Sequence, residues 1–582
     1  MSRLLQEDSY VLLKEDGDAL LLEIHYAKAD FSGTGTLSGI GRLLAIGKAT
    51  LSGAGALSAF GRIWKLGAAT LAGIGSLAAK ATAIFAAKGT LTGVGSLAAA
   101  GSYIKSAAAT LVGVGSLAAH GILYGLARLK VYISWDGTGN FDGPYDDITN
   151  DVKHTTVRRG RSSELGIAEA GTLELRVNDS NGKYSPENIT SPLHGLLLPR
   201  RQVKFEGSLG GTISIFYGYL EKITPHPQLS EQDTYIYAID GLDFLSRAEI
   251  SSTLYKNQLT GVLIGHILDN AGWSATARDI NTGQLTVPLG YWQNSNALNA
   301  IHELEKSEFE AFAYIDHAGN FKYEDGAFRD AAACAATFNN NYQDLKYTLE
   351  AKSIYNEIRV EVRKCELQPQ LEIWRLEEEP TIANGVTKTF WASFEDLADS
   401  IVTPVATTDY QAWTGAGGTG TDKTADISIV TTKFAQSAKL EVTNNTGVTV
   451  YLYLLKLRGE LYDMQSSITV KAEDAGVGSS QAKYQKRTLT LASKFLTNVA
   501  IAQTYADNAL AKYKDPSPDI SLTLIATMEG AGDELIHRQI SDKIRVINTK
   551  LGLDKYFFIE QANYNFSEGG KRQEVIWTLS EV

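Results

Sequence analysis

An acidic loop between residues 136 and 147 holds the best candidate for a metal site. Its oxygen-bearing side chains fall at relative positions 1, 3, 5, 7 and 12, which are Asp136, Thr138, Asn140, Asp142 and Asp147. Hard oxygen ligands at these offsets can wrap a Ca²⁺ ion. However, Phe141 stands where the sharp turn of such a loop needs glycine, and Asp147 replaces the bidentate glutamate. These departures favour the alternative interpretation, a polar hairpin loop.

Residues suited to hydrolysis form no catalytic motif in this sequence. It contains no HExxH, no GxSxG, no Cys–His motif and no GxxxxGK[ST] phosphate loop. Glu303, Glu305, Glu308 and Glu310 cluster on a predicted helix and the strand entry after it, where a solvated face explains them better than a pair of glycosidase carboxylates. The sequence therefore predicts no catalytic residue and no cofactor, and a cell-wall hydrolase using Glu308 is the weakest hypothesis.

Aromatic side chains are frequent between residues 384 and 480, where short strands and turns indicate a β-sandwich insertion. They are Trp391, Tyr410, Trp413, Tyr451 and Tyr453. Their flat apolar faces could stack on sugar rings, although such residues are more often part of a core. Trp391 and Trp413 are the candidate glycan contacts.

A repeat of 20 residues precedes these elements, from Phe31 to Lys130. Five copies begin at residues 31, 51, 71, 91 and 111, and the block contains no Asp or Glu. Small residues and leucine alternate with other residues, which places them on one face of a strand. A fixed period indicates units that bury their faces only by stacking. The predicted assembly face consists of Leu51, Gly53, Gly55, Leu57, Leu71, Gly73, Gly75, Leu77, Leu91, Gly93, Gly95, Leu97, Leu111, Gly113, Gly115 and Leu117.

Two alternatives exist for the repeat block, namely helices packed in a membrane and flexible low-complexity chain. Lys48, Arg62 and Lys65 are among the charges that interrupt it too often for a spanning helix. The block carries nine Lys and Arg, so it could meet an anionic surface such as lipopolysaccharide, teichoic acid, membrane or nucleic acid. Because these charges are spread out, we favour the simpler role of keeping an apolar stalk soluble.

Length and composition indicate an assembly of several β-rich domains. The chain has 582 residues, which suggests three to five domains, and Thr, Tyr, Val and Ile dominate many short segments. Its two cysteines, Cys334 and Cys365, match no zinc spacing, and we expect two buried free thiols from a reducing cytoplasm. The first 18 residues contain no apolar core of signal-peptide length, so we expect no ordinary secretion.

The pattern along the chain changes several times. Residues 257–310 follow the helical period, residues 311–323 read as a hairpin, and a last helix is predicted at 498–513 before Pro516. Elsewhere strands and turns recur at the short intervals of a sandwich or barrel. The pattern itself sets apart a hairpin at 1–30, the repeats at 31–130 and the insertion at 384–480.

An ordered series of segments runs through residues 131–582, namely Trp135–Phe141, Asp147–Val152, Arg158–Arg161, Gly171–Asn178, Tyr184–Pro186, Phe216–Leu220, Ala238–Leu242, Ala271–Trp273, Ser307–Glu308, Ile540–Val546 and Val575–Ser580. In the order and spacing of these segments, residues 131–582 resemble the tail-tip (baseplate) hub proteins of tailed bacteriophages. The resemblance implies a first barrel at 131–250, a helical domain at 251–344 and a second barrel at 345–383 plus 481–582, interrupted by the insertion at 384–480. Glycine-rich repeats similar to those at 31–130 also occur in other phage tail proteins, so we interpret the block as a tip extension or stalk.

This resemblance implies a homotrimer in which two barrel domains per subunit close a pseudo-sixfold ring. Its implied partners are the tail tube, the distal tail protein ring, the tape-measure protein, other tip or fibre proteins and a bacterial surface receptor. Phage DNA would pass through the lumen without specific binding. The protein would be made in the host cytoplasm and reside at the distal tip of the virion tail.

The charge of residues 131–582 is consistent with a DNA passage. They carry 42 Lys and Arg against 59 Asp and Glu, a net charge of −17. An acidic lumen avoids the phosphate contacts that would make DNA stick. The leading hypothesis is therefore a structural hub that opens at adsorption. The alternative is a receptor- or glycan-binding tail adhesin with the repeat as stalk and the insertion as lectin.

Overall fold

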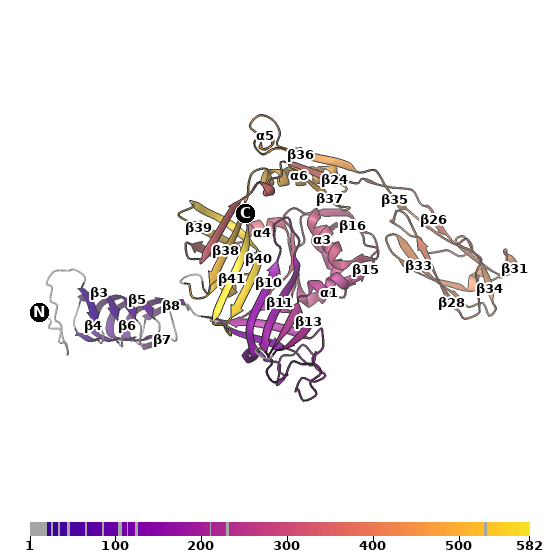
Figure 1. Ribbon diagram of the computed structural model, residues 1–582. Helices are drawn as coiled ribbons and strands as arrows, with labels where there is room; N and C mark the ends of the chain where they lie inside the picture. Colours follow the sequence, from indigo (N-terminus) through magenta and orange to yellow (C-terminus); the bar gives the residue numbers. More distant parts are fainter. Residues whose placement is uncertain are drawn as a thin grey trace.

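The computed structural model describes residues 20–24, 27–32, 35–43, 47–63, 67–83, 87–102, 107–112, 115–122, 126–209, 211–228, 232–528 and 532–582 (Figure 1). Side chains are described from residue 126 onward, apart from Met464. The chain is mainly β, as the sequence predicts. Within these ranges, no helix has the length and apolar character needed to cross a bilayer.

The repeat block forms a stack of parallel strands. Its longest strands are β4 (Gly47–Ile63), β5 (Gly67–Ala83) and β6 (Ala87–Ser102). Each residue pairs with the residue 20 positions further on, as in Leu51 with Leu71 and Leu71 with Leu91. The shorter strands of this sheet are β1 (Leu20–Ile24), β2 (Ala27–Ser32), β3 (Gly35–Leu43), β7 (Ala107–Val112) and β8 (Gly115–Ile122).

Part of the N-terminal prediction lies outside the described residues. This applies to residues 1–19, which include the first strand of the expected hairpin, and to Gly113. The expected second strand of that hairpin is β1, which pairs in parallel with β3. The other assembly-face residues lie in β4 to β8, while their side chains lie outside the described part of the chain.

A twelve-stranded sheet forms the centre of the remaining chain (Figure 1). Its first six strands in sequence, here the first unit, are β9 (Arg128–Ile133), β10 (Val152–Gly160), β11 (Glu169–Asn178), β12 (Gln202–Ser208), β13 (Thr212–Pro227) and β14 (Gln232–Ile239). The second unit consists of β22 (Ala336–Asn339), β23 (Asp344–Leu349), β38 (Pro518–Ile525), β39 (Lys543–Asn548), β40 (Leu553–Ser567) and β41 (Arg572–Glu581).

The two units have the same strand order. The first unit runs β10-β11-β14-β13-β12-β9 across the sheet, and the second runs β23-β38-β41-β40-β39-β22. With each unit's strands counted in sequence order, both follow the order 2-3-6-5-4-1. Neighbouring strands are antiparallel in both units, except that β22 pairs in parallel with β39. The fold therefore contains an internal duplication.

Two local irregularities recur at equivalent places and support this duplication. A bulge leaves Glu221 of β13 out of register with β14, and a bulge leaves Glu560 of β40 out of register with β41. The residue before each bulge accepts a hydrogen bond of 2.7 Å from a backbone N–H, Leu220 from Arg200 and Ile559 from Ser541. Arg200 and Ser541 both have a positive φ, 67° and 72°, which is uncommon for residues other than glycine.

Helices and a hairpin link the two units. The helices are α1 (Leu242–Arg247), α2 (Thr260–Asn270), α3 (Ala297–Ser307) and α4 (Gly326–Ala331). The Asn296 side chain caps α3 by accepting a bond from the Asn299 N–H at 3.0 Å. The predicted hairpin is confirmed as β20 (Phe312–Ile315) and β21 (Phe321–Glu324). The remaining short strands are β15 (Glu249–Ile250), β16 (Tyr255–Leu259), β17 (Arg278–Ile280), β18 (Thr286–Gly290) and β19 (Ser295–Asn296).

A small layer connects the second unit to the insertion. It contains β24 (Glu357–Val362), β36 (Ile468–Glu473), β37 (Thr488–Ala492), α5 (Ser480–Tyr484) and α6 (Val499–Tyr513). Helix α6 confirms the helix predicted at 498–513. Asn498 caps it, and it buries Ala502, Ala506 and Ala509. The last helix, α7 (Glu534–His537), precedes β39.

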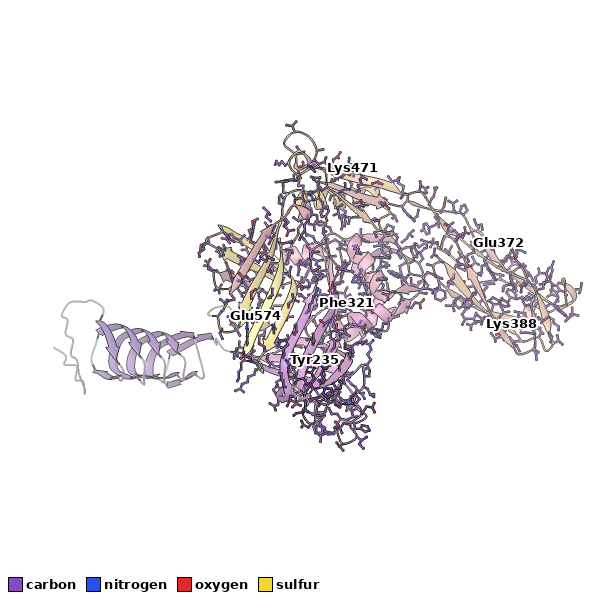
Figure 2. All side chains as sticks on the ribbon, in the orientation of Figure 1. Tyr235, Phe321, Glu372, Lys388, Lys471 and Glu574 are labelled. Atoms are coloured by element: carbon purple, nitrogen blue, oxygen red, sulfur yellow. The ribbon has the colours of Figure 1, made fainter. Side chains whose placement is uncertain are left out.

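The insertion has a hydrophobic core of its own, which includes Leu440, Leu452 and Leu457. Figure 2 shows Lys388 of the insertion, and Glu372 just before it in the sequence, far from Glu574 of the second unit. The strands within 384–480 are β28 (Thr387–Ser393), β29 (Leu397–Ala398), β30 (Tyr410–Gly415), β31 (Thr419–Asp422), β32 (Ile427–Lys433), β33 (Ser437–Asn444), β34 (Val450–Gly459) and β35 (Leu461–Met464). Three strands that precede residue 384 pair with β34 or β35, namely β25 (Cys365–Leu367), β26 (Leu371–Arg375) and β27 (Thr381–Ile382). The domain boundaries drawn from the sequence stay predictions.

Candidate assembly interface

One antiparallel ladder joins the two units, between β10 of the first and β40 of the second. Its Cα partners run from Thr155 opposite Phe566 to Gly160 opposite Gln561. Gly160 has a φ of +99°, and a Cβ atom there would lie 2.1 Å from the carbonyl oxygen of Glu560. Only glycine combines this backbone conformation with this close approach.

The Glu560 carboxylate holds three segments of the chain together at this ladder. Its side chain is buried and lies 2.5 Å from Nε of Arg161 and 2.7 Å from Nη2 of Arg329, while the Ser580 hydroxyl donates to it at 2.6 Å. Both guanidinium groups also stack on the Phe312 ring, with Cζ at 4.2 and 5.2 Å from its centroid. Burial alone would raise the pKa of Glu560, but the two arginines outweigh burial and hold that pKa far below its usual range.

A second buried carboxyl group lies close to the same arginine. Burial raises the pKa of Glu305 to about 7, although Arg161 opposes this change. Oε1 of Glu305 accepts a bond from the Ala313 N–H at 3.2 Å, while its Oε2 and the Nη2 of Arg161 are buried and have no hydrogen-bond partner among the described residues. The interpretation of residues 303–310 as a solvated face was therefore wrong for Glu305 and also for Glu308, because both side chains are buried.

Glu308 has a structural role that the sequence pattern did not reveal. Its carboxylate accepts hydrogen bonds from the Thr260 hydroxyl, from the Tyr323 hydroxyl at 3.0 Å and from the Gln284 N–H at 2.6 Å. These bonds tie α2 and the following loop to β21. A carboxylate that is buried and fully bonded in this way has no access to a polysaccharide.

Each unit also has a sheet edge that no other described strand covers. β23 pairs with β38 on one side only. On one side of β13, residues 212–219 pair with β12. On the other side the pairing with β14 continues to Pro227, so the last residues of β13 have no described partner strand on the β12 side. Tyr347 and Leu349 of β23 are 41% and 56% exposed. Unpaired edges of this kind are templates for pairing with another chain.

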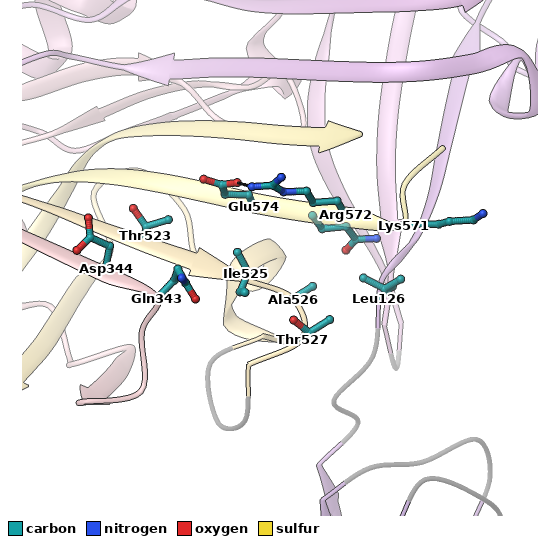
Figure 3. A pocket seen from close by; sticks show the side chains of 11 residues that line it. Leu126, Gln343, Asp344, Thr523, Ile525, Ala526, Thr527, Lys571, Arg572 and Glu574 are labelled. Atoms are coloured by element: carbon teal, nitrogen blue, oxygen red, sulfur yellow. Dashed lines mark hydrogen bonds and ion pairs between the residues drawn. The ribbon is translucent and has the colours of Figure 1, made fainter. Parts of the chain in front are cut away.

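A groove of about 450 Å³ lies beside the start of β23 (Figure 3). Gln343 and Asp344 line one side, the end of β38 lines the floor, and Leu126 lies where the chain arrives from the repeats. Arg572 and Glu574 form an ion pair of 3.2 Å across β41. The groove brings together no nucleophile and general base, so its lining offers a contact surface and no evident chemistry.

Of the predicted calcium-loop residues, Asp136 and Thr138 are in contact, because the Thr138 hydroxyl donates to the Asp136 carboxylate at 2.9 Å. The Asp136 carboxylate accepts bonds from the Thr138 N–H at 3.0 Å and from the Ser134 hydroxyl at 3.0 Å, and Asp147 accepts from the Thr149 N–H at 3.0 Å. In the described ranges, no group of three or more His, Cys, Asp or Glu side chains is arranged to hold a metal ion. The calcium site stays a prediction that a calcium titration tests.

The two candidate glycan contacts lie in different strands of the insertion. Trp391 of β28 is 60% exposed and stacks on Phe434, with ring centroids 6.2 Å apart and an interplanar angle of 21°. Trp413 of β30 is half-buried, and its indole Nε1 is buried and has no hydrogen-bond partner. The structure does not bring the two indoles onto one strand pair, since β28 and β30 belong to separate sheets.

Both cysteines are less buried than expected. Cys334 is exposed and Cys365 is partly exposed. Cys334 lies in the loop before β22, where the chain is not covered by another element, which explains the error. Neither cysteine is part of the candidate interface.

The fold is thus a β-rich chain with an internally duplicated sheet. No family model and no curated protein sequence matches the chain. In fold it is similar to three solved phage or bacterial tail proteins, each at 10% identity. They are a 43 kDa tail protein of prophage MuSo2 from Shewanella oneidensis (78% of this chain, 98% of that chain, TM-score 0.42), a tail protein from Neisseria meningitidis MC58 (78%, 97%, 0.43), and prophage tail protein gp18 from Listeria monocytogenes EGD-e (77%, 94%, 0.37).

Proposed function

We propose that this chain is a structural subunit of a phage-type tail tip, in which three copies form a ring that closes the distal end of the tail tube. The ring would hold back the tape-measure protein and DNA, and it would open at adsorption. No residue would be catalytic. The supporting observation is the duplicated six-stranded unit, joined edge to edge within one chain.

The duplication supports a ring because one contact between similar units already exists within the subunit and could recur between subunits. A head-to-tail contact closes into a ring when its rotation divides a full turn. The β10–β40 ladder is such a contact between the first and second units, and among the described strands each unit keeps an uncovered edge for the next copy. Three copies supply six similar units, which suits a hexameric tube above.

The charge of the chain supports the passage of DNA through this ring. Residues 131–582 have a net charge of −17, so an acidic lumen would leave few phosphate contacts. The ring's partners would be the tail tube, the distal tail protein ring, the tape-measure protein and other tip or fibre proteins. The repeat stack would then project as a tip extension.

Native mass spectrometry of the purified full chain tests the ring. A species at three times 63.0 kDa supports it. A monomer that persists at the highest soluble concentration would overturn a ring formed by this chain. Antibody labelling of intact tail particles tests the location, and label along the whole tail rather than at its tip would contradict the tip assignment.

A second candidate function is binding of a bacterial surface glycan by the insertion. It is favoured by the exposed Trp391–Phe434 stack, which offers a flat apolar face. Lys439 lies directly opposite Trp391 in the β28–β33 ladder, and it forms an ion pair with Glu441 at 2.8 Å, so charged groups flank the indole. Sugar rings combine apolar faces with hydroxyl groups in this way.

Binding of the full chain to a panel of host-envelope glycans tests this candidate. Trp391→Ala should abolish binding, and Ile189→Ala, which removes an exposed apolar side chain from the first unit, should leave it unchanged. Absence of binding by the unaltered chain across the panel would exclude the glycan role.

A further inference from the structure

We propose that the free edge of β23 pairs in antiparallel fashion with residues 222–227 of β13 in a neighbouring copy of this chain. The partner is thus a second copy, and the contact repeats between chains the β10–β40 ladder found within one chain. The inference deepens the proposed ring and rests on it, because it names the strands and the register that would close the ring.

The duplication fixes which residues are equivalent. Within the first unit, Thr155 of β10 pairs with Leu175, which pairs with Ile236 of β14. Within the second unit, Leu345 of β23 pairs with Leu522, which pairs with Trp577 of β41. Leu345 is therefore equivalent to Thr155, and the ladders keep this offset of 190 as far as Arg158 and Thr348. Continuing the numbering along the two chains matches Leu349 with Arg159, and Glu350, one residue beyond β23 and still extended, with Gly160.

The other side of the contact aligns through the two bulges. Glu221 of β13 and Glu560 of β40 are each left out of register with the following strand. Lys222, which pairs with Tyr237, is therefore equivalent to Gln561, which pairs with Thr578. Equivalent residues of β13 and β40 differ in number by 339 from this position to Pro227 and Phe566.

Transferring the β10–β40 register gives six residue pairs between copies. Thr155 opposite Phe566 becomes Leu345 opposite Pro227, and Gly160 opposite Gln561 becomes Glu350 opposite Lys222. The pairs between these ends are Lys346 with His226, Tyr347 with Pro225, Thr348 with Thr224, and Leu349 with Ile223. The register places opposite charges together at Glu350 and Lys222, which favours this pairing.

Exposure shows what the missing contact leaves open. Val157 and Arg159 of β10, which pair with Tyr564 and Ala562 of the second unit, are 0% and 3% exposed. Their equivalents in β23 are Tyr347 and Leu349, which are 41% and 56% exposed. Two large apolar side chains on an uncovered edge strand mark an interaction surface. A neighbouring β13 would cover them as β40 covers β10.

Two prolines make this edge selective. In the β10–β40 ladder the Arg161 N–H donates to the Glu560 carbonyl at 2.8 Å. In an antiparallel ladder every second residue makes such bonds, so the N–H groups of β40 that point toward β10 belong to Ala562, Tyr564 and Phe566. Their equivalents in β13 are Ile223, Pro225 and Pro227. The prolines cannot donate, but their carbonyls can accept from Tyr347 and Leu345. Four of the six backbone bonds therefore remain with β23 as the main donor.

The same prolines disfavour other partners. Pairing of a β13 edge with a second β13 edge would place proline on both strands and lose donors from each side. Proline is also one of the devices that blunt exposed edges against unselective pairing. The edge of β13 is thus suited to a strand that supplies the donors, as β23 does.

Cysteine cross-linking of the full chain tests the register. The variant combines Lys346→Cys with His226→Cys in a background with Cys334→Ser and Cys365→Ala. This pair is a non-hydrogen-bonded one, where Cα atoms lie about 4.5 Å apart, within the range that a disulfide spans. The matched control combines Lys346→Cys with Lys222→Cys, which is four residues out of register and therefore about 13 Å away.

Oxidation should convert most of the first variant to covalent trimer on a denaturing gel and leave the control as monomer. Native mass spectrometry of the unaltered chain separates the two levels of the proposal. A trimer in that measurement with no cross-link, or with equal cross-linking of both variants, would overturn the register and leave the ring standing. A monomer there together with no cross-link would overturn both the ring and this contact.

Discussion

Replacement of Glu560 by glutamine should strongly weaken the joint between the two units. The substitution keeps the shape of the side chain but removes the charge that two buried guanidinium groups share. Arg161 and Arg329 are each 2% exposed, and their contacts to Glu560 are 2.5 and 2.7 Å. Removing one partner of a buried ion pair costs about 3–5 kcal/mol, because the remaining charge has no compensation.

The matched control is Glu574→Gln on the neighbouring strand β41. Glu574 pairs with Arg572 at 3.2 Å, and the arginine is 67% exposed. A surface ion pair of this kind contributes about 0–1 kcal/mol. Urea unfolding, followed by far-ultraviolet circular dichroism and tryptophan fluorescence, should therefore show a much larger loss of stability for Glu560→Gln than for the control.

The pH dependence provides an independent check of the same reasoning. The folded-state pKa of Glu560 lies far below that of the unfolded chain, which is about 4.3 for glutamate. A depressed pKa gives stability that is present above the unfolded value and is lost as pH falls toward the folded value. The difference between the unaltered chain and Glu560→Gln should thus be constant from pH 8 to about pH 5 and shrink below about pH 4. Equal unfolding midpoints for Glu560→Gln and Glu574→Gln at pH 7 would refute this account.

Three further perturbations follow from the geometry. Gly160→Ala should lower the free energy of unfolding by about 1–3 kcal/mol from backbone strain alone, because φ is +99° and the new Cβ would meet the Glu560 carbonyl. The midpoint of urea unfolding measures this loss. An unchanged midpoint would contradict the close approach. Glu305→Gln should stabilise the chain more at pH 8 than at pH 5. Burial raises the pKa of Glu305 to about 7, so the free-energy cost of ionising it in the folded chain grows between about pH 4.3 and pH 7. Thermal unfolding at both pH values tests this, and equal shifts of the midpoint would argue against it. Glu357→Gln should remove part of the loss of stability that the chain shows between about pH 4 and pH 2. Burial would raise the pKa of Glu357, but Lys486 and Lys471 outweigh burial and lower this pKa to about 2. Acid-unfolding curves that superimpose on those of the unaltered chain would show that this carboxylate does not titrate there.

Local signals in the sequence predicted the elements that depend on nearby residues. The hairpin at 311–323 was predictable because Asp316 and Gly319 form its turn, with the Asp316 carboxylate accepting from the Ala318 N–H at 2.8 Å. The helix at 499–513 was predictable from its apolar stripe and the proline after it. Such features need no knowledge of distant partners.

The interface could not be predicted in the same way, because its residues are far apart in the sequence. Glu560 meets Arg161 across 399 positions, and no short motif marks such a pair. The glutamates at 305 and 308 looked solvated because the helical pattern cannot show that β20 and β21 cover them. The duplication left a weak signal, Leu220-Glu221 in one unit and Ile559-Glu560 in the other, which becomes visible only when the strand orders are compared.

Because the repeats stack in register, the length of the stack can change by whole repeats. Since every residue of β4 faces the residue 20 positions later in β5, removing or adding one copy preserves all remaining pairs. One copy alters the stack by about 4.8 Å, the spacing of neighbouring strands. An insertion or deletion of 20 residues would therefore lengthen or shorten the stack by one strand and leave the two units of the twelve-stranded sheet unchanged.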